Sequence, residues 1–86
     1  MMSHELFICP VCGYNGLEEP AYTDGVASFV ICPSCGTEFG YDDATTSHAV
    51  LRQKWIEYGM RWWLEQFSPP HGWNPVEQLK RAGLIQ

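Results

Sequence analysis

Four cysteines are the residues of this chain with the clearest capacity for chemistry. They occur in two matching frames, CPVCG at residues 9–13 and CPSCG at residues 32–36, with nineteen residues between Cys12 and Cys32. Two residues between paired cysteines let both sulfurs reach one metal ion from a tight turn. We therefore predict a single metal site with four ligands, which are Cys9, Cys12, Cys32 and Cys35.

The residues around the cysteines favour this metal site. Proline presets the backbone of each turn, and Gly13 and Gly36 permit a positive φ that lets N–H groups turn toward the sulfurs. Four thiolates satisfy a tetrahedral Zn²⁺ and leave no position for water or substrate, so one zinc ion per chain would be structural. Two disulfides are an alternative, but they suit an oxidising compartment, and nothing in the sequence signals export.

Iron is the second metal that such a site can hold, because a tetrahedral set of cysteine sulfurs suits both zinc and iron. The paired Cys-Pro-x-Cys-Gly turns, with Tyr14 after Gly13, resemble those that hold the redox iron of rubredoxin-type proteins. The two turns lie closer together in the sequence than is typical of rubredoxins, however, and this spacing is common in zinc ribbons. Zinc is therefore the predicted metal and iron the alternative.

Charge is distributed unevenly along the 86 residues. Residues 1–51 contain seven acidic residues and no Lys or Arg, whereas residues 52–86 contain five basic residues and three acidic ones. A zinc ion with four thiolates would add a formal charge of about −2 to the acidic half. Because nonspecific nucleic-acid binding depends mostly on Lys and Arg, this distribution argues against a nucleic-acid partner.

The length predicts one domain, residues 1–86, whose small core needs an additional constraint such as a bound metal. No uninterrupted apolar stretch approaches the roughly 18 residues of a membrane-spanning helix, and the first five residues lack the features of a signal peptide. We therefore expect a cytoplasmic protein with no membrane partner.

Short strands are the elements expected to position the cysteines. Residues 5–8 lead into the first cysteine turn, residues 27–31 lead into the second, and residues 37–41 extend it. Between them, Asp24-Gly25 favours a tight hairpin turn. These patterns predict an α+β fold with a zinc-ribbon (rubredoxin-like) antiparallel β sheet over residues 1–43. A helical part over residues 44–86 is expected to pack on it.

The helical part is predicted to hold one long helix and one short final helix. The long helix should run from about residue 47 to Gln66, with two separate apolar faces. Prolines after Ser68 end it, and the final helix has Asn74 as its cap and Gly83 after its last turn. One apolar face should lie on the ribbon. The other should meet the C-terminal segment, another subunit or a partner.

Several of these motifs together resemble the bacterial cysteine-rich CPCC family of small proteins. They are the two cysteine frames, the FGYDD turn at residues 39–43 and the LRQKWI segment at residues 51–56. The sequence departs from the family name because Val11 and Ser34 replace the middle cysteine of each frame, although the four ligands remain. The resemblance covers roughly residues 6–67 and implies a zinc-binding fold without an established activity.

The leading hypothesis is a noncatalytic zinc-binding protein that acts as a small acidic protein-interaction module. Its partner would be another protein, or a second copy in a homodimer, bound through the aromatic helix. Trp62, Trp63 and Trp73 are the candidates for exposure, and core packing is the alternative for each of them. The competing functions are rubredoxin-like electron transfer by iron and, less favoured, nucleic-acid binding by a zinc ribbon.

The sequence predicts no enzyme activity. His4, His48 and His71 are far apart, and a surface or turn position explains each of them. The adjacent Asp42 and Asp43 suit a hard cation, but two acids before a helix more often complement its dipole. The sequence contains no serine–histidine–aspartate set, phosphate-binding glycine loop or metal-hydrolase motif.

Overall fold

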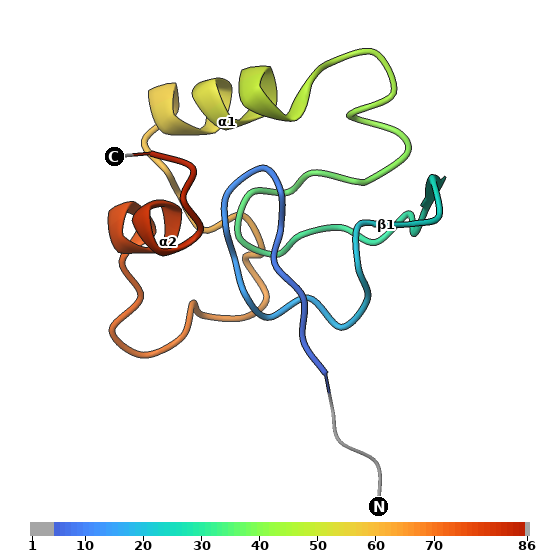
Figure 1. Cartoon of the computed structure of the whole chain (residues 1–86). Coiled ribbons are helices and arrows are strands. Elements are labelled where there is room, and N and C mark those ends of the chain that lie inside the picture. Colours follow the sequence, from blue (N-terminus) through green and yellow to red (C-terminus); the bar gives the residue numbers. More distant parts are fainter. Residues whose placement is uncertain (1–4, 86) are drawn as a thin grey trace, which may run out of the picture.

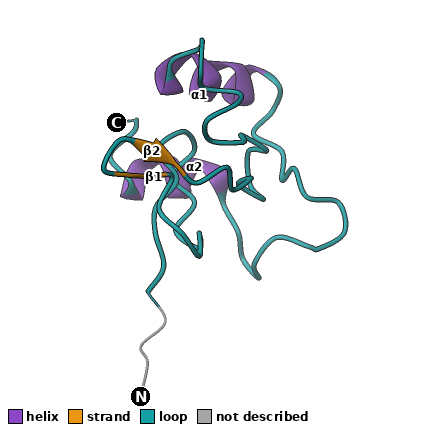
Figure 2. Ribbon diagram, turned by 90° about the vertical axis from the view of Figure 1, so that its right-hand side faces the viewer, coloured by secondary structure: helices purple, strands orange, loops and turns teal. Residues whose placement is uncertain are grey.

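Turns and loops make up most of the structure, and two short strands and two helices are set around them (Figure 2). The computed structural model describes residues 5–85. In chain order, the elements are β1 (Tyr22–Thr23), β2 (Val26–Ala27), α1 (His48–Glu57) and α2 (Pro75–Arg81). In Figure 1 the two cysteine turns, residues 9–13 in blue and residues 32–36 in green, lie side by side near the centre, with α1 above them and α2 to one side.

Each cysteine turn closes a short hairpin. In the first hairpin, the backbone groups of Phe7 and Leu17 exchange hydrogen bonds of 2.8 and 3.1 Å. In the second, Ile31 faces Glu38 as an isolated antiparallel bridge. Each hairpin therefore contributes one bridge, and the longer strands predicted for residues 5–8 and 37–41 are not formed.

The hairpin predicted at Asp24-Gly25 is confirmed. β1 and β2 pair antiparallel, with Thr23 opposite Val26. The φ angles of Asp24 and Gly25 are 52° and 81°. Two successive positive φ values are what a type I′ turn requires, and this turn matches the twist of the strands that it joins.

Of the strand predicted over residues 27–31, only Ala27 lies in β2, and the chain turns at Phe29. This residue has a φ of 59°, and the hydroxyl oxygen of Ser28 accepts the N–H of Val30 at 3.3 Å. A residue in the left-handed region turns the chain out of the extended path of a strand. The α+β class is thus retained, but the sheet in residues 5–85 is a two-stranded one.

α1 begins at the predicted place. The side chain of Ser47 accepts the N–H of Val50 at 3.2 Å, as an N-cap residue does. Asp42 and Asp43 lie outside the first turn, which contains no acidic residue. Their predicted role as partners of the helix dipole is therefore wrong.

α1 ends at Glu57, so the long helix predicted to reach Gln66 is not formed. The φ angles of Gly59 and Met60 are 98° and 52°, and the N–H of Met60 bonds back to the carbonyl oxygen of Trp55 at 2.9 Å. This arrangement is a Schellman motif, in which a left-handed glycine terminates a helix. Because the helix stops there, the two-faced aromatic helix is also wrong, and Trp62 and Trp63 lie in the irregular segment that follows.

The final helix is confirmed. Pro75 occupies the first position of α2, and the side chain of Asn74 accepts the N–H of Glu77 at 3.1 Å. Gly83, just beyond the helix, has a φ of 73°. The N–H of Gly83 bonds to the carbonyl oxygen of Lys80, so the same type of motif ends α2. Within residues 5–85, no helix is both long and apolar enough to cross a membrane.

The buried core is centred on the cysteine turns. Its members are Cys9, Val11, Cys12, Leu17, Ala21, Cys32, Phe39, Trp55 and Leu79. Leu79 of α2 is fully buried, whereas Val76, Trp63 and Phe67 are exposed. α2 packs on the cysteine turns, where Gln78 donates to the carbonyl oxygen of Cys12, and Trp63 and Phe67 are left exposed.

The carboxylate of Asp43, just before α1, contacts three different parts of the chain. Its carboxylate accepts hydrogen bonds from the N–H of Gly40 (2.6 Å) and the hydroxyl of Tyr22 (2.8 Å). Its Oδ2 lies 2.7 Å from Nε2 of His48, and the side chain is 1% exposed. Partial burial opposes ionisation, but the hydrogen bonds from His48, Gly40 and Tyr22 outweigh it and lower the pKa of Asp43.

A lowered pKa makes the contribution of Asp43 to stability dependent on pH. The contribution is fully present above the unfolded-state pKa of about 4 and is lost as the pH falls through the lower folded-state value. We expect Asp43→Asn to reduce the free energy of unfolding at pH 6. The difference in unfolding free energy between the variant and wild type should become smaller below about pH 4. Urea unfolding of both proteins across this range measures the difference, and a constant difference would contradict the prediction.

Candidate metal centre

The four cysteine sulfurs converge at one point of the core. All four Sγ atoms lie within 4.8 Å of one another. Two of these distances join the two turns, from Cys9 to Cys35 at 3.8 Å and from Cys12 to Cys32 at 3.7 Å. All four thiols are free, so the structure contains neither of the disulfides that the sequence left as an alternative.

The sulfur positions fit a tetrahedral metal ion. Zinc–sulfur bonds of about 2.3 Å place the corners of a regular tetrahedron about 3.8 Å apart. The distances of 3.7 and 3.8 Å between the two turns match this edge. The donor set and its geometry therefore suit a four-coordinate ion such as zinc, and iron fits the same four sulfurs.

The two cysteine turns share one hydrogen-bond pattern. The N–H of Gly13 bonds to the carbonyl oxygen of Cys9 at 2.9 Å, and the N–H of Gly36 bonds to that of Cys32 at 2.7 Å. The φ angles of Gly13 and Gly36 are 85° and 81°, as predicted from their places after the second cysteine. In the first turn, the N–H of Val11 also points at Cys9 Sγ, 3.4 Å away. Hydrogen bonds of this kind favour the thiolate form that a metal requires.

Hydrogen bonds between the thiols shift the pKa values of Cys9, Cys32 and Cys35 in different directions. Hydrogen bonds with the other cysteines, that of Cys12 first, raise the pKa of Cys32, and burial raises it further. The pKa of Cys9 is likewise raised, mainly by its hydrogen bond with Cys12. In contrast, hydrogen bonds from Cys12, Cys32 and Cys9 lower the pKa of Cys35 against the effect of burial. A metal that binds here must therefore displace the remaining protons.

Three buried polar residues lie at the cysteine turns. They are Ser34, Thr37 and Gln78. Thr37 Oγ1 lies 3.3 Å from Cys35 Sγ, and Gln78 donates to both Ser34 Oγ and the carbonyl oxygen of Cys12 at 3.1 Å. Buried polar groups are tolerated when they are hydrogen-bonded, and each of these has its partner at the candidate metal centre.

The segment after α1 covers the second cysteine turn. The N–H of Trp63 lies 3.1 Å from the carbonyl oxygens of both Pro33 and Ser34, and the N–H of Leu64 donates to Pro33 at 3.0 Å. The indole of Trp63 lies against Gly36, where an added Cβ would stand 2.6 Å from Trp63 Cγ. This close contact explains why the turn needs glycine for space as well as for its φ.

Gly25 is a control that separates the lack of space at Gly36 from the strain of its backbone. Both glycines have a φ of 81°, but no atom lies within 4 Å of a Cβ added at Gly25. Both Gly→Ala changes incur the left-handed strain of about 1–2 kcal/mol. We expect Gly36→Ala to cost a further 1–3 kcal/mol or so, because Trp63 must move. Chemical unfolding of the two variants measures the difference, and equal losses would show that the contact with Trp63 has no energetic weight.

The histidines and aspartates that the sequence analysis considered do not form a second site within residues 5–85. His48 contacts Asp43, and Asp42 accepts the N–H of Glu38 at 2.8 Å. His71 lies in a turn and is exposed, as predicted. His4 lies outside the described residues. The only group of three or more potential metal ligands found in residues 5–85 is the four-cysteine cluster.

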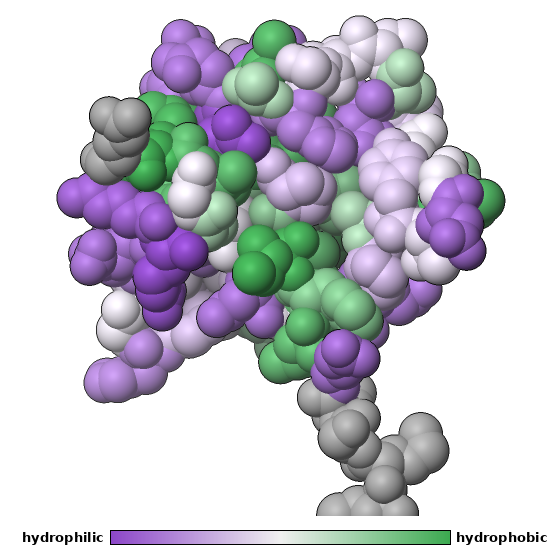
Figure 3. Space-filling view, viewed as in Figure 1, coloured by the Kyte–Doolittle hydropathy of each residue, from purple (hydrophilic) through white to green (hydrophobic). Residues whose placement is uncertain are grey.

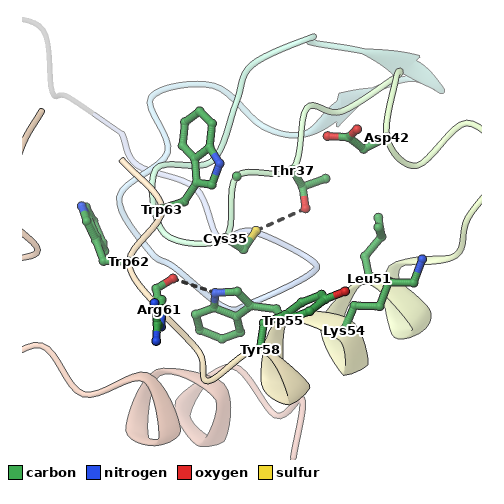
Figure 4. Close-up of a pocket in the computed structure, with 11 residues that line it drawn as sticks. Cys35, Thr37, Asp42, Leu51, Lys54, Trp55, Tyr58, Arg61, Trp62 and Trp63 are labelled. Carbon is green, nitrogen blue, oxygen red and sulfur yellow. Dashed lines mark hydrogen bonds between the residues drawn. The ribbon is translucent and has the colours of Figure 1, made fainter. Parts of the chain in front are cut away.

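A pocket of about 410 Å³ opens beside the centre (Figure 4). Cys35, Gly36 and Thr37 of the second cysteine turn form one side. Asp42 comes from the turn before α1, and the remaining lining residues come from α1 and the segment after it. They are Leu51, Lys54, Trp55, Tyr58, Arg61, Trp62 and Trp63. Cys35 is the one cysteine of the four that is not fully buried, so the pocket reaches the candidate metal centre itself.

The tryptophans divide between core and surface. Trp55 is buried, and its indole N–H donates to the carbonyl oxygen of Arg61 at 2.9 Å. Trp62 is half-buried and packs edge to face on Tyr14 and Trp73, with ring centroids 5.5 and 5.4 Å apart. Trp63 is 49% exposed. The predicted exposure therefore applies most clearly to Trp63.

The sequence reasoning missed Arg52 and Gln78 as residues of this centre. Arg52 donates from Nε to the carbonyl oxygen of Val11 at 2.8 Å and from Nη2 to that of Pro10 at 2.9 Å. Both side chains cross from the helices to the first cysteine turn. No spacing rule connects them to the cysteines, and the one available signal was a polar residue among the apolar positions of a predicted helix.

The fold and the site together define a small α+β protein with a zinc-ribbon-like four-cysteine site. Over 76 residues the chain is 34% identical to the uncharacterized protein YoaQ of Bacillus subtilis (strain 168), covering 69% of this chain and 64% of YoaQ. It is 33% identical over 75 residues to the uncharacterized protein YozI of the same strain, covering 66% of this chain and 62% of YozI. The chain thus spans slightly less than two thirds of either relative.

These relatives carry no described activity in their names. No family model matches the chain, and no solved structure matches it significantly. The comparisons therefore place the chain beside small proteins of Bacillus, while its grouping with the CPCC family stays a prediction.

Proposed function

We propose that this chain is a noncatalytic zinc-binding protein of the CPCC type, in which a structural zinc ion stabilises a small protein-interaction module. The observation that carries the proposal is the closed set of four sulfurs within 4.8 Å of one another. Four protein ligands fill a tetrahedral zinc ion, and a filled ion offers no position to a substrate. A reducing compartment such as the cytoplasm keeps such thiols available for metal.

The proposed interaction surface consists of exposed aromatic rings near the pocket. Trp63 is 49% exposed, and Tyr58 and Phe67 are 79% and 69% exposed. Large aromatic side chains are enriched among the residues that contribute most to protein–protein binding. We assign this surface, rather than a face of a long helix, to contact with another protein or with a second copy of the chain.

Other exposed apolar residues are distributed more widely. Figure 3 shows hydrophobic patches in green separated by polar residues in purple. Leu6 and Ile8 of the N-terminal hairpin are exposed. Because these residues come from the N-terminal hairpin and not from the pocket, substitutions can address the two regions separately.

Native mass spectrometry combined with elemental analysis tests the proposal in one experiment. We expect one zinc ion per chain. One iron ion per chain would instead favour electron transfer at the same four sulfurs, and the absence of any metal would contradict the proposal. A dimer that is lost on Trp63→Ala but kept on Ile8→Ala would support self-association through the aromatic surface, and a monomer at all concentrations would remove self-association.

A further inference from the structure

Two side chains from the helices hold the backbone of the first cysteine turn. Arg52 of α1 donates to the carbonyl oxygens of Pro10 and Val11, at 2.9 and 2.8 Å. Gln78 of α2 donates to the carbonyl oxygen of Cys12 at 3.1 Å. The three consecutive carbonyl groups that span the turn are thus all paired by residues from distant parts of the chain.

Gln78 also connects the first turn to the second. Its Nε2 donates to Ser34 Oγ at 3.1 Å, while its Oε1 accepts the indole N–H of Trp73 at 2.8 Å. The indole can only donate, so it fixes which end of the amide faces the cysteine turns. Since Gln78 is buried, all of these hydrogen bonds are made away from water.

We propose that Arg52 and Gln78 are positioning residues of the metal centre, and that they slow its loss of zinc by holding the two cysteine turns where the four sulfurs converge. The inference rests on the proposed function, because it concerns the same centre. Without these donors, the buried carbonyl groups of the first turn would lose their partners. The turn would then favour other backbone conformations, and any such change moves the sulfurs of both Cys9 and Cys12.

Arg52 provides charge as well as geometry. Residues 1–51 contain no Lys or Arg, and a zinc ion with four thiolates carries a formal charge of about −2. Arg52 is a basic residue whose side chain contacts the first cysteine turn directly. Its planar guanidinium reaches two carbonyl oxygens at once, which a lysine ammonium cannot reproduce. Comparing Arg52→Lys with Arg52→Ala therefore separates the geometric contribution from the charge.

The test measures how fast the full zinc-loaded chain transfers its metal to a chromogenic chelator, and how Co²⁺ absorbs when it replaces zinc. The variants are Arg52→Lys, Arg52→Ala and Gln78→Met. Two matched controls accompany them. Lys80→Ala removes an exposed positive charge from α2, and Gln53→Met replaces an exposed glutamine of α1.

We expect Arg52→Ala and Gln78→Met to release zinc at least about tenfold faster than wild type, as for other residues that orient metal ligands. Arg52→Lys should fall between Arg52→Ala and wild type, and both controls should match wild type. The sulfur-to-cobalt absorption bands should shift in the Arg52 and Gln78 variants, because the sulfurs themselves are displaced.

Two results would overturn the proposal. One is unchanged zinc release in both Arg52→Ala and Gln78→Met. The other is a lower unfolding temperature with an unchanged cobalt spectrum, since that result assigns both residues a purely structural role. If Arg52→Ala fails to fold, Arg52→Lys and Gln78→Met still decide the question. A wild-type chain that binds no zinc would instead contradict the proposed function.

Discussion

Removing the metal with a chelator is expected to unfold the zinc-loaded protein. Three of the four cysteines are fully buried at the centre of the core, and both helices contact the turns that carry them. A structural zinc ion contributes about 10 kcal/mol or more at neutral pH, which equals the whole stability of a typical small domain. Circular dichroism should therefore lose its helical signal with the chelator and regain it when one equivalent of zinc is added.

The same prediction can be made with single substitutions. Cys9→Ser leaves three sulfurs for the ion and should abolish cooperative unfolding, because a serine hydroxyl is not among the usual zinc ligands. His71→Ala is the control, since His71 is exposed in a turn away from the cysteines. A Cys9→Ser protein that melts at the wild-type temperature would show that the four cysteines do not support the fold through a metal.

The features that the sequence predicted correctly depend on neighbouring residues. The two cysteine turns, the Asp24-Gly25 hairpin and the Asn74-Pro75 helix start each need a few consecutive residues in a defined conformation. The spacing of the turns also predicted that their sulfurs would meet, because two tight turns with paired sulfurs need one shared ion. Such features can be predicted from a few consecutive residues without knowledge of the rest of the fold.

The end of α1 could not be predicted from neighbouring residues alone. Apolar periodicity continues beyond Gly59 and predicts a helix to Gln66, although a glycine inside a helical pattern also permits a terminating turn. The left-handed φ of Met60 decides between the two, and it has no sequence signal. Contacts with residues distant in the sequence favour the shorter helix. The N–H groups of Trp63 and Leu64 donate to carbonyl oxygens of the second cysteine turn and not to the carbonyl oxygens of a continued helix.

The contacts of Arg52 and Gln78 with the cysteine turns could not be predicted from the sequence for a different reason. Gln78 occupies a buried place on α2, but helical periodicity is counted from apolar residues and scores a glutamine as exposed. Its partners, Cys12 and Ser34, become visible only once both turns are folded. Arg52 likewise lies 41 residues from Val11 in the sequence. These contacts define the surroundings of the metal centre, so the ligands were predictable and the residues that orient them were not.

The second large effect is expected at Trp55. Its side chain is buried against the core, and its indole N–H holds the carbonyl oxygen of Arg61 just after α1 ends. Replacing a buried tryptophan with alanine typically costs about 3–5 kcal/mol. We expect Trp55→Ala to lose this amount in chemical unfolding of the zinc-loaded protein, and Trp55→Phe to lose less because the phenyl ring keeps most of the apolar contact.

Trp63→Ala is the matched comparison, because Trp63 lies in the same pocket but is half exposed. We expect it to cost about 1–2 kcal/mol, since roughly half of its apolar surface already faces water. If Trp63 belongs to the proposed interaction surface, Trp63→Ala must destabilise the protein less than Trp55→Ala does, because a ring that binds a partner must not be essential to the fold. If Trp63→Ala destabilised the protein as much as Trp55→Ala, Trp63 would belong to the core, and the interaction surface would have to be sought among the other exposed aromatic rings.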